Sequence, residues 1–291
     1  MKAKFDLYQH VTDQIIASLE SGIKPWSCPW KKDQRDFGFP GNYFTGKHYS
    51  GINVLLLWAA RYNCGFESDL WMTYKQGQQK GATVRKGEKG TKVVFAAPID
   101  KEDKKTGEKE QVFIYRAFTV FNLDQFEGVE REEVVILTDF DVHKQAEDIL
   151  QHCGANIIEQ GSRAYYSHGG DYIKLPPRNS FTDSDNFYTT AFHEIGHWTG
   201  AKDRLARTFG KKFGDKDYAF EELIAELTAA FTGAGVGIIG EHLGHESYIA
   251  SWLDKLKNDK RFIFQASAAA AKAHRYILDQ VEQNKAREIA A

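Results

Sequence analysis

Apolar side chains recur at helical spacing in several segments of the chain. Near the N-terminus the apolar residues from Leu7 to Leu19 fall three or four positions apart, and Gly22 follows as a stop. We therefore predict a first helix over residues 5–21. The same spacing predicts further helices over 52–62, 73–80, 141–154, 218–233, 247–257 and 261–283.

Short apolar runs rich in β-branched and aromatic residues predict strands in both halves of the chain. Residues 91–99 and 112–122 flank a charged turn, as in a β-hairpin, and shorter strands are predicted over 155–160 and 171–176. The first half therefore mixes helices with a sheet, and the second half is mostly helical with a small sheet. The predicted fold class is α+β.

A charged stretch separates the two halves. We expect an N-terminal domain over 1–127, a connector over 128–138 and a C-terminal domain over 139–291; the run VVIL in the connector would also fit a strand. Residues through Glu127 hold 19 Lys and Arg against 15 Asp and Glu, a balance of +4. The remainder holds 19 against 25, a balance of −6. Domains of opposite charge are expected to have different partners.

Composition limits the class of protein. The 291 residues are 42% hydrophobic and 27% charged, which is typical of a soluble globular protein. No apolar run approaches the roughly 20 residues of a membrane span, and the N-terminus does not resemble a signal peptide. Cys28, Cys64 and Cys153 are far apart and odd in number, which favours a reducing compartment over disulfides or a cysteine zinc site. We expect a cytoplasmic protein with no membrane partner.

The stretch FHEIGHWTG at 192–200 contains the first candidate chemistry. His193 and His197 are four residues apart, so on a helix both imidazoles lie on one face and can bind one ion. Glu194 lies beside them and is placed to act as a general base on water polarised by that ion. Polar residues that can cap a helix precede the stretch at 182–185. The alternative is a surface helix with two solvated histidines.

A second helix offers a carboxylate as third ligand. Glu222 and Glu226 are four residues apart in the predicted helix 218–233, so one can bind the ion while the other orients a ligand histidine. Their spacing resembles the pattern of thermolysin-like zincins, which favours Glu222 as the ligand and Glu226 as the orienting residue, with the reverse assignment as the alternative. His242 and His245 are competing nitrogen ligands. Two imidazoles and a carboxylate suit Zn²⁺, with other divalent ions as alternatives.

A basic, glycine-rich stretch over 71–92 is the second candidate site. It holds six Lys and Arg against one acid, Glu88, and aromatic residues lie within and before it. Cations follow phosphates and rings stack on bases, so this composition favours binding of single-stranded DNA. The alternative is a solvated lysine-rich loop with the aromatic residues in the core. The candidate contacts are Tyr43, Lys47, Tyr49, Trp71, Lys75, Lys80, Arg85, Lys86, Lys89 and Lys92, with Phe44 and Tyr74 as further rings.

These segments resemble one known family over nearly the whole chain. NYFTGKHYSGINVLLL and WMTYKQGQQKGATVRKGEKGTKVVF are similar to the N-terminal domain of ArdC antirestriction proteins of conjugative plasmids. DYIKLPPRNSF, FYTTAFHEIGHWTGAKDRLAR and YAFEELIAEL are similar to the zincin-like metallopeptidase domain of the same family. The resemblance implies a single-stranded DNA-binding domain, a metallopeptidase domain with an unidentified protein substrate, and a role in protecting incoming plasmid DNA from host restriction.

Two other functions remain open. A pure DNA-binding protein would keep the metal for a structural role, or carry a vestigial site, and would protect DNA by covering it. A free-standing peptidase whose basic half recruits acidic proteins would show no preference for DNA. Dependence of protection on Glu194 separates the first of these from the peptidase. A salt-sensitive preference for single strands separates the second from a DNA-binding protein.

Overall fold

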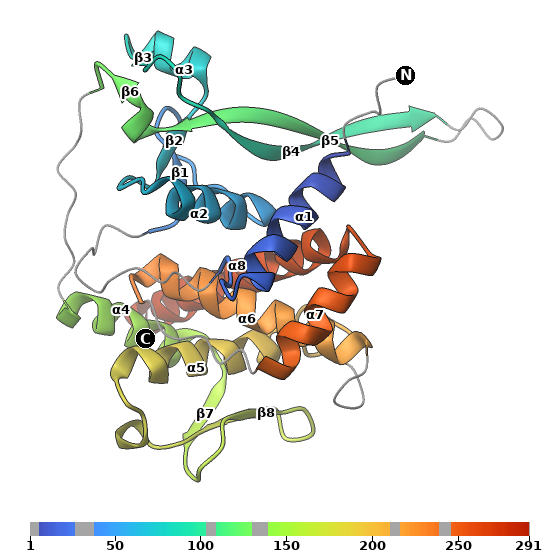
Figure 1. The fold of residues 1–291 in the computed structure, drawn as a ribbon. Coiled ribbons are helices and arrows are strands. Elements are labelled where there is room, and N and C mark those ends of the chain that lie inside the picture. Colours follow the sequence, from blue (N-terminus) through green and yellow to red (C-terminus); the bar gives the residue numbers. More distant parts are fainter. Residues whose placement is uncertain are drawn as a thin grey trace. The chain divides into compact units, whose positions relative to one another are not determined.

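The computed structural model describes six segments of the chain and groups them into two compact units (Figure 1). Unit 1 joins Met1–Phe39 to Glu133–Ala291, and unit 2 is Pro40–Glu132. Among the described residues, no helix is both long and apolar enough to cross a membrane. The described segments are 6–26, 38–102, 109–129, 139–209, 216–238 and 246–290.

Unit 2 is a small sheet with helices packed on it. The strands run in the order β1-β2-β5-β4, with β1 parallel to β2 and the other pairs antiparallel, and β3 pairs separately with β6. Helix α2 covers one face, where Leu57 packs against Trp71, Val93 and Val120. The elements are β1 Gly41–Asn42, α2 Ile52–Cys64, β2 Leu70–Met72, α3 Tyr74–Gln79, β3 Thr83–Val84, β4 Thr91–Glu102, β5 Lys109–Asn122, η1 Leu123–Gln125 and β6 Phe126–Glu127.

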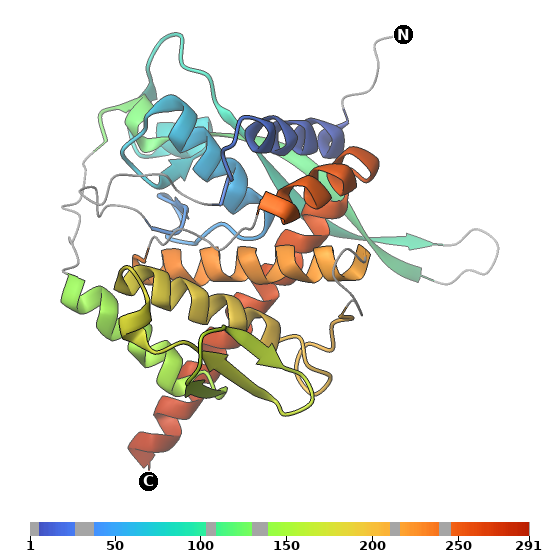
Figure 2. The ribbon, with the colours of Figure 1, turned by 60° about the horizontal axis from the view of Figure 1, so that its bottom comes forward.

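Unit 1 is mostly helical, with a three-stranded sheet in the order β7-β9-β8. Helix α6 runs through the middle of this unit (Figure 2), and its residues 221–234 are all buried because α5, α7 and α8 pack around it. The elements are α1 Leu7–Glu20, α4 Asp139–His152, β7 Asn156–Glu159, β8 Tyr165–Ser167, β9 Tyr172–Leu175, η2 Arg178–Ser180, α5 Ser184–Trp198, α6 Lys216–Val236, α7 Glu246–Asn258 and α8 Phe262–Ala290.

The N-terminal helix groups with the C-terminal half of the chain. Helix α1 contacts α7, the Thr12 hydroxyl donates to the carbonyl of Lys260 at 2.9 Å, and the ring of Tyr8 lies 4.7 Å from that of Phe264. The sequence-based division placed α1 in the first domain, over 1–127. The structure groups α1 with unit 1 because partners almost 250 residues away cover the apolar face of α1, and a local pattern does not reveal them.

The α+β fold class and the predicted helices are confirmed, with boundaries shifted by a few residues. The long hairpin of β4 and β5 is also confirmed. The short strands β1, β2, β3, β6 and β8 were not predicted, because two or three residues carry too little periodicity. Cys28, His242 and His245, with most of the connector, lie outside the described residues.

Candidate metal centre and nucleic-acid surface

Helix α5 presents the HEIGH motif on a buried scaffold. Its N-cap is Asp183, whose side chain accepts a hydrogen bond from the backbone N–H of Asn186 at 2.9 Å, within the stretch where capping was expected. Phe192, Ile195 and Trp198 are buried in the core of unit 1. The opposite face of the helix therefore turns His193, Glu194 and His197 toward a cleft.

Helices α5 and α6 approach closely at Gly196. A Cβ atom on Gly196 would lie 3.1 Å from Cα and 3.3 Å from the carbonyl oxygen of Ala225, so a larger residue would push the helices apart. Ala225 lies between Glu222 and Glu226 on α6. The close approach therefore brings the carboxylates of α6 within reach of the histidines of α5.

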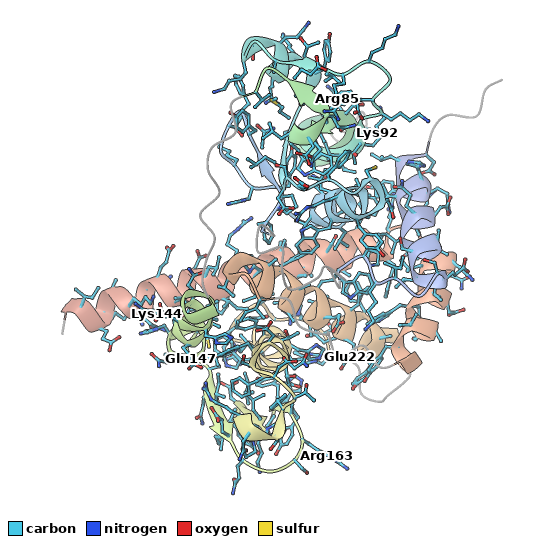
Figure 3. All side chains as sticks on the ribbon, turned by 60° about the vertical axis from the view of Figure 1, so that its left-hand side comes forward. Arg85, Lys92, Lys144, Glu147, Arg163 and Glu222 are labelled. Carbon is cyan, nitrogen blue, oxygen red and sulfur yellow. The ribbon has the colours of Figure 1, made fainter. Side chains whose placement is uncertain are left out.

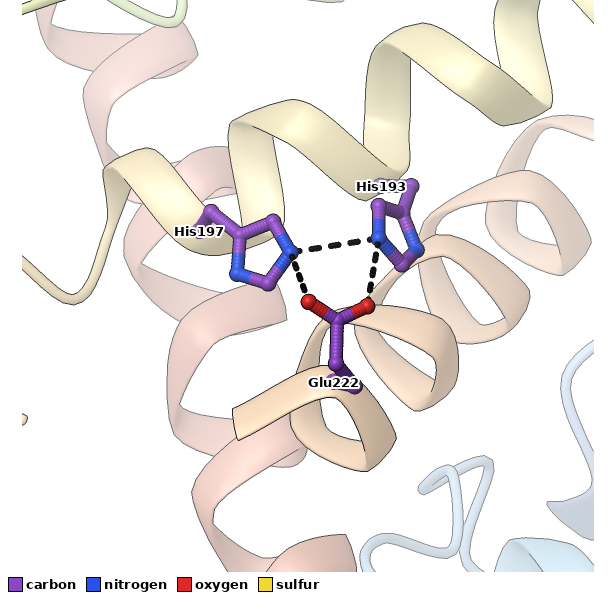
Figure 4. Close-up of side chains that lie close together, drawn as sticks. All are labelled: His193, His197 and Glu222. Carbon is purple, nitrogen blue, oxygen red and sulfur yellow. Dashed lines mark hydrogen bonds and ion pairs between the residues drawn. The ribbon is translucent and has the colours of Figure 1, made fainter. Parts of the chain in front are cut away.

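The side chains of His193, His197 and Glu222 face one another (Figure 4). The two Nε2 atoms are 3.2 Å apart, and each lies 3.5 Å from one carboxylate oxygen of Glu222. A tetrahedral ion with metal–ligand bonds of about 2.0–2.2 Å has ligand atoms about 3.3–3.6 Å apart. The triangle therefore matches the donor set and the spacing that a divalent ion requires.

Two further carboxylates face the outer ring nitrogens, Nδ1, of the histidines. Glu226 Oε2 lies 3.6 Å from Nδ1 of His193, and Glu221 Oε1 lies 3.2 Å from Nδ1 of His197. Glu222 therefore faces the two Nε2 atoms, and Glu226 faces Nδ1 of His193. This arrangement is the one that the zincin-like pattern favours. Glu221 was not singled out from the sequence, although it directly precedes Glu222 in the same helix.

Arg207 fixes the position of Glu221. Its guanidinium donates to both carboxylate oxygens of Glu221 at 2.7 and 2.9 Å, to the carbonyl of Gly196 at 2.6 Å and to the hydroxyl of Thr199 at 2.8 Å. Burial alone would raise the pKa of Glu221, but the hydrogen bonds with Arg207 and His197 outweigh it and lower that pKa.

Gly200 makes room for Arg207. A Cβ atom on Gly200 would lie 2.8 Å from Nη2 of Arg207 and 2.5 Å from Cζ of Phe209. A glycine at position 200 therefore has two reasons: Arg207 and Phe209 pack against it, and it closely follows the end of α5 at Trp198.

The metal-ligand candidates line a cleft of about 660 Å³. One wall is formed by residues 162–166, which include the start of the edge strand β8, and another by the tyrosines Tyr218 and Tyr248. Their hydroxyls lie 3.2 Å apart. Burial disfavours a charged His193 ring, but the carboxylates of Glu222 and Glu226 outweigh it and raise the pKa of His193 well above its ordinary value. An ion that binds here therefore displaces a proton.

The predicted DNA contacts of unit 2 divide into surface and core residues. Lys47, Lys75, Lys80, Arg85, Lys86, Lys89 and Lys92 are exposed, and Arg85 and Lys92 are labelled in Figure 3. Trp71 is 0% exposed in the core of unit 2, so its assignment as a stacking residue is wrong. It lies on β2, between β1 and β5 and beneath α2, where no base can reach the ring. Tyr49 is half-buried, and its hydroxyl accepts a hydrogen bond from Asn42.

Asn42 organises the surface near Lys80. Its side-chain oxygen accepts from the backbone N–H groups of Phe44 and Thr45 at 3.1 and 3.0 Å, which fixes the turn that presents the exposed Phe44 ring. Lys80 Nζ lies 5.7 Å from the ring centre of Tyr43 and 6.0 Å from that of Phe44. Two rings and a cation thus lie together at the surface of unit 2.

Comparisons with known proteins match both halves. The model of the N-terminal domain of anti-restriction factor ArdC matches residues 5–121, and that of a zincin-like metallopeptidase matches residues 144–269. The chain is similar to the crystal structure of antirestriction ArdC protein from the R388 plasmid in its metal-free form, with 39% identity, a TM-score of 0.82 and coverage of 96% of this chain and 99% of that one. Against the Mn(II)-bound form the TM-score is 0.79 at 39% identity, with coverage of 95% and 98%.

Two further relatives extend the comparison. The protein y4eC of Sinorhizobium fredii is 37% identical over 91% of this chain and 89% of its own length. A DNA primase TraC of Escherichia coli is 36% identical over 99% of this chain but only 21% of its own length. With both family models matched and the fold shared over nearly its whole length, the chain belongs to the ArdC family of antirestriction proteins, and its zincin-like domain carries a donor set for a divalent metal ion.

Proposed function

We propose that this protein acts in the cytoplasm to protect incoming DNA from restriction. Unit 2 would bind single-stranded DNA, and a site in unit 1 would hydrolyse a peptide bond of a protein substrate. The hydrolytic site would be a zinc ion held by His193, His197 and Glu222, with Glu194 as general base. The triangle of facing ligand atoms, with sides of 3.2–3.5 Å, is the observation that carries this proposal. Glu194 directly follows His193 on α5 and lines the same cleft.

The residues around the triangle supply what peptide hydrolysis needs. A zinc ion in this position would act as a Lewis acid and lower the pKa of a coordinated water. Glu194 takes up the proton of the attacking water and passes it to the leaving amine. Glu226 and Glu221 face the Nδ1 atoms of His193 and His197, and the two Nε2 atoms face Glu222 across the cleft.

The shape of the cleft supports an extended peptide as substrate. Strand β8 is at the edge of its sheet, and Tyr165 and Tyr166 of this strand line the same cleft as the histidines. An edge strand offers unpaired backbone N–H and C=O groups, to which an extended peptide can add as a further strand. Such a peptide would lie with its backbone beside Glu194.

The surface of unit 2 supports single-stranded DNA as the other ligand. The rings of Tyr43 and Phe44 lie under Lys80, and Lys75 of the neighbouring helix α3 is exposed. Rings stack on unpaired bases whereas cations contact phosphates, so the combination favours single strands over duplex. Binding should weaken steeply as salt is added.

The test compares Glu194→Gln with wild type for protection of plasmid DNA entering a restricting recipient cell, with metal content and expression checked. We expect the variant to keep its metal and its affinity for single-stranded DNA and to lose protection, because only the general base is removed. Unchanged protection with metal bound would assign protection to DNA binding alone. Absence of single-stranded DNA binding by the wild type would refute the other half of the proposal.

A further inference from the structure

Two phenylalanines stand exposed on the β4–β5 hairpin of unit 2. Phe95 is 58% exposed and Phe118 is 45% exposed, and their ring centres are 5.9 Å apart with an interplanar angle of 89°. Phe118 lies directly opposite Val93, so the two rings form a diagonal cross-strand pair. Neither ring was a candidate from the sequence, because apolar residues in a strand are read as core.

The exposed pair continues a face of the sheet that is buried elsewhere. Val93 and Val120 lie on the same face and are covered by Leu57 of α2. Figure 1 shows β4 and β5 extending beyond α2. The apolar face therefore runs past the helix that covers it, and the two rings occupy the uncovered part.

The strand that carries Phe95 is fixed by α2. The side chain of Asn53 accepts from the backbone N–H of Val94 and donates to its carbonyl, both at 2.7 Å. These two bonds occupy the outer edge of β4 one residue before Phe95. The rings are thus presented by a strand held in register on one side by β5 and on the other by α2, which limits the entropy lost when a ligand binds.

A cation lies next to the rings. Arg116 is exposed and is directly opposite Phe95 in the β4–β5 register, so its side chain lies on the same face of the hairpin as the rings. Exposed rings beside a guanidinium match a ligand that has both flat apolar faces and negative charge, as single-stranded nucleic acid does. If the ligand were instead a purely apolar surface of another protein, the guanidinium of Arg116 would face no negative charge in the complex.

We infer that Phe95, Phe118 and Arg116 form a base-stacking platform for single-stranded nucleic acid, separate from the Lys80 surface. This inference rests on the proposed binding of single-stranded DNA by unit 2. Because the rings are nearly perpendicular, each offers its own free face to a different base. Arg116 contacts the phosphate between or beside them.

The test measures fluorescence anisotropy of a labelled oligothymidylate of about 20 nucleotides, longer than the roughly 4–16 nucleotides that such sites occupy, with the full chain at several salt concentrations. The double variant Phe95→Leu with Phe118→Leu keeps the apolar bulk and removes the rings. We expect its affinity to fall by about tenfold or more while the slope of log affinity against log salt stays the same, because stacking involves no counterion. Arg116→Gln should reduce that slope by about 0.7.

Two controls accompany these variants. Tyr62→Leu removes a ring of α2 in the same unit that is 38% exposed, and it should bind as the wild type does. Phe118→Tyr keeps the ring and should also retain affinity. A wild type that binds the oligonucleotide while the double leucine variant binds it equally well would overturn this inference and leave the proposed function standing. Lost protection in cells with unchanged oligonucleotide affinity would also overturn it, and would assign the face to a protein partner.

Discussion

The two units carry their candidate sites in opposite ways. In unit 1 the groups around the metal site are buried or nearly so, and the ring nitrogens of His193 and His197 lie 3.2 to 3.6 Å from one another and from the three carboxylates of α6. In unit 2 the candidate DNA-binding cations are exposed and spread over α3, the loops and the hairpin. The first site is a closed network, and the second is an open surface.

This contrast determines how each site should respond to mutation. Within a buried network the groups fix one another's position, so that removing one leaves others without a partner in a low-dielectric environment. On an exposed surface each cation contributes separately and salt screens it. Single substitutions should therefore have large effects in unit 1 and small, additive effects in unit 2.

The largest effect is expected for His193→Ala. The variant loses one of three ligands, so its affinity for Zn²⁺ or Mn²⁺ should fall by more than the roughly 10- to 100-fold typical of losing an outer partner of a ligand. Isothermal titration calorimetry measures this loss, and the anisotropy assay should show unchanged affinity for single-stranded DNA. A parallel loss of DNA affinity would show that the metal site of unit 1 and DNA binding by unit 2 are not independent.

Arg207→Leu should be the next largest in effect. The substitution leaves the buried carboxylate of Glu221 without its guanidinium, which typically costs about 3–5 kcal/mol of stability. It also removes the group that fixes Glu221 beside Nδ1 of His197. We expect lower resistance to urea and metal affinity reduced by about 10- to 100-fold. The double variant Arg207→Leu with Glu221→Leu serves as control, since it removes both charges. Its stability should recover in part, and its metal affinity should not.

How far the sequence predicted these sites follows from the range of the interactions. Helical periodicity places His193 and His197 on one face with Glu194 between them, and it places Glu222 and Glu226 on one face of the next helix. It does not decide which carboxylate faces inward, because that depends on where α5 crosses α6.

Residues that reach the sites from elsewhere in the chain could not be predicted. Arg207 comes from a loop after α5, and its role depends on Glu221, 14 residues later. Trp71 looked like a surface ring because it precedes a basic stretch, yet β2 lies between two other strands. Phe95 and Phe118 were not among the candidate residues, because the sequence does not show where α2 stops covering the sheet.

A smaller effect, dependent on pH, is expected for Glu147 in unit 1. Burial alone would raise the pKa of this carboxylate, but hydrogen bonds from Arg178 and from the hydroxyl of Tyr188, the latter at 2.7 Å, outweigh it and hold the pKa below its ordinary value of 4.5. A depressed folded-state pKa contributes stability above the unfolded-state value and loses it as pH falls through the folded-state value. The Tm difference between wild type and Glu147→Gln should therefore be largest near neutral pH and vanish in acid.

Tyr188→Phe is the matched variant for Glu147. It removes one of the hydrogen bonds that lower the pKa and leaves the charge of Glu147 in place. We expect a smaller loss of Tm than for Glu147→Gln over the same pH range. An effect of Glu147→Gln that is equally large at acid and neutral pH would show that the carboxylate acts through packing and not through its charge.

The smallest effect is expected for Lys80→Gln in unit 2, and it tests the open-surface half of the comparison. Lys80 lies over the rings of Tyr43 and Phe44, so its removal should weaken oligonucleotide binding by a few fold and reduce the salt slope by about 0.7. Lys86→Gln, which neutralises another exposed cation of unit 2, is the control for loss of charge alone. If Lys80 and Lys86 act independently, the double variant shows the sum of the two free-energy losses. A loss well beyond that sum would mean that the surface of unit 2 behaves as a coupled network, as the metal site does.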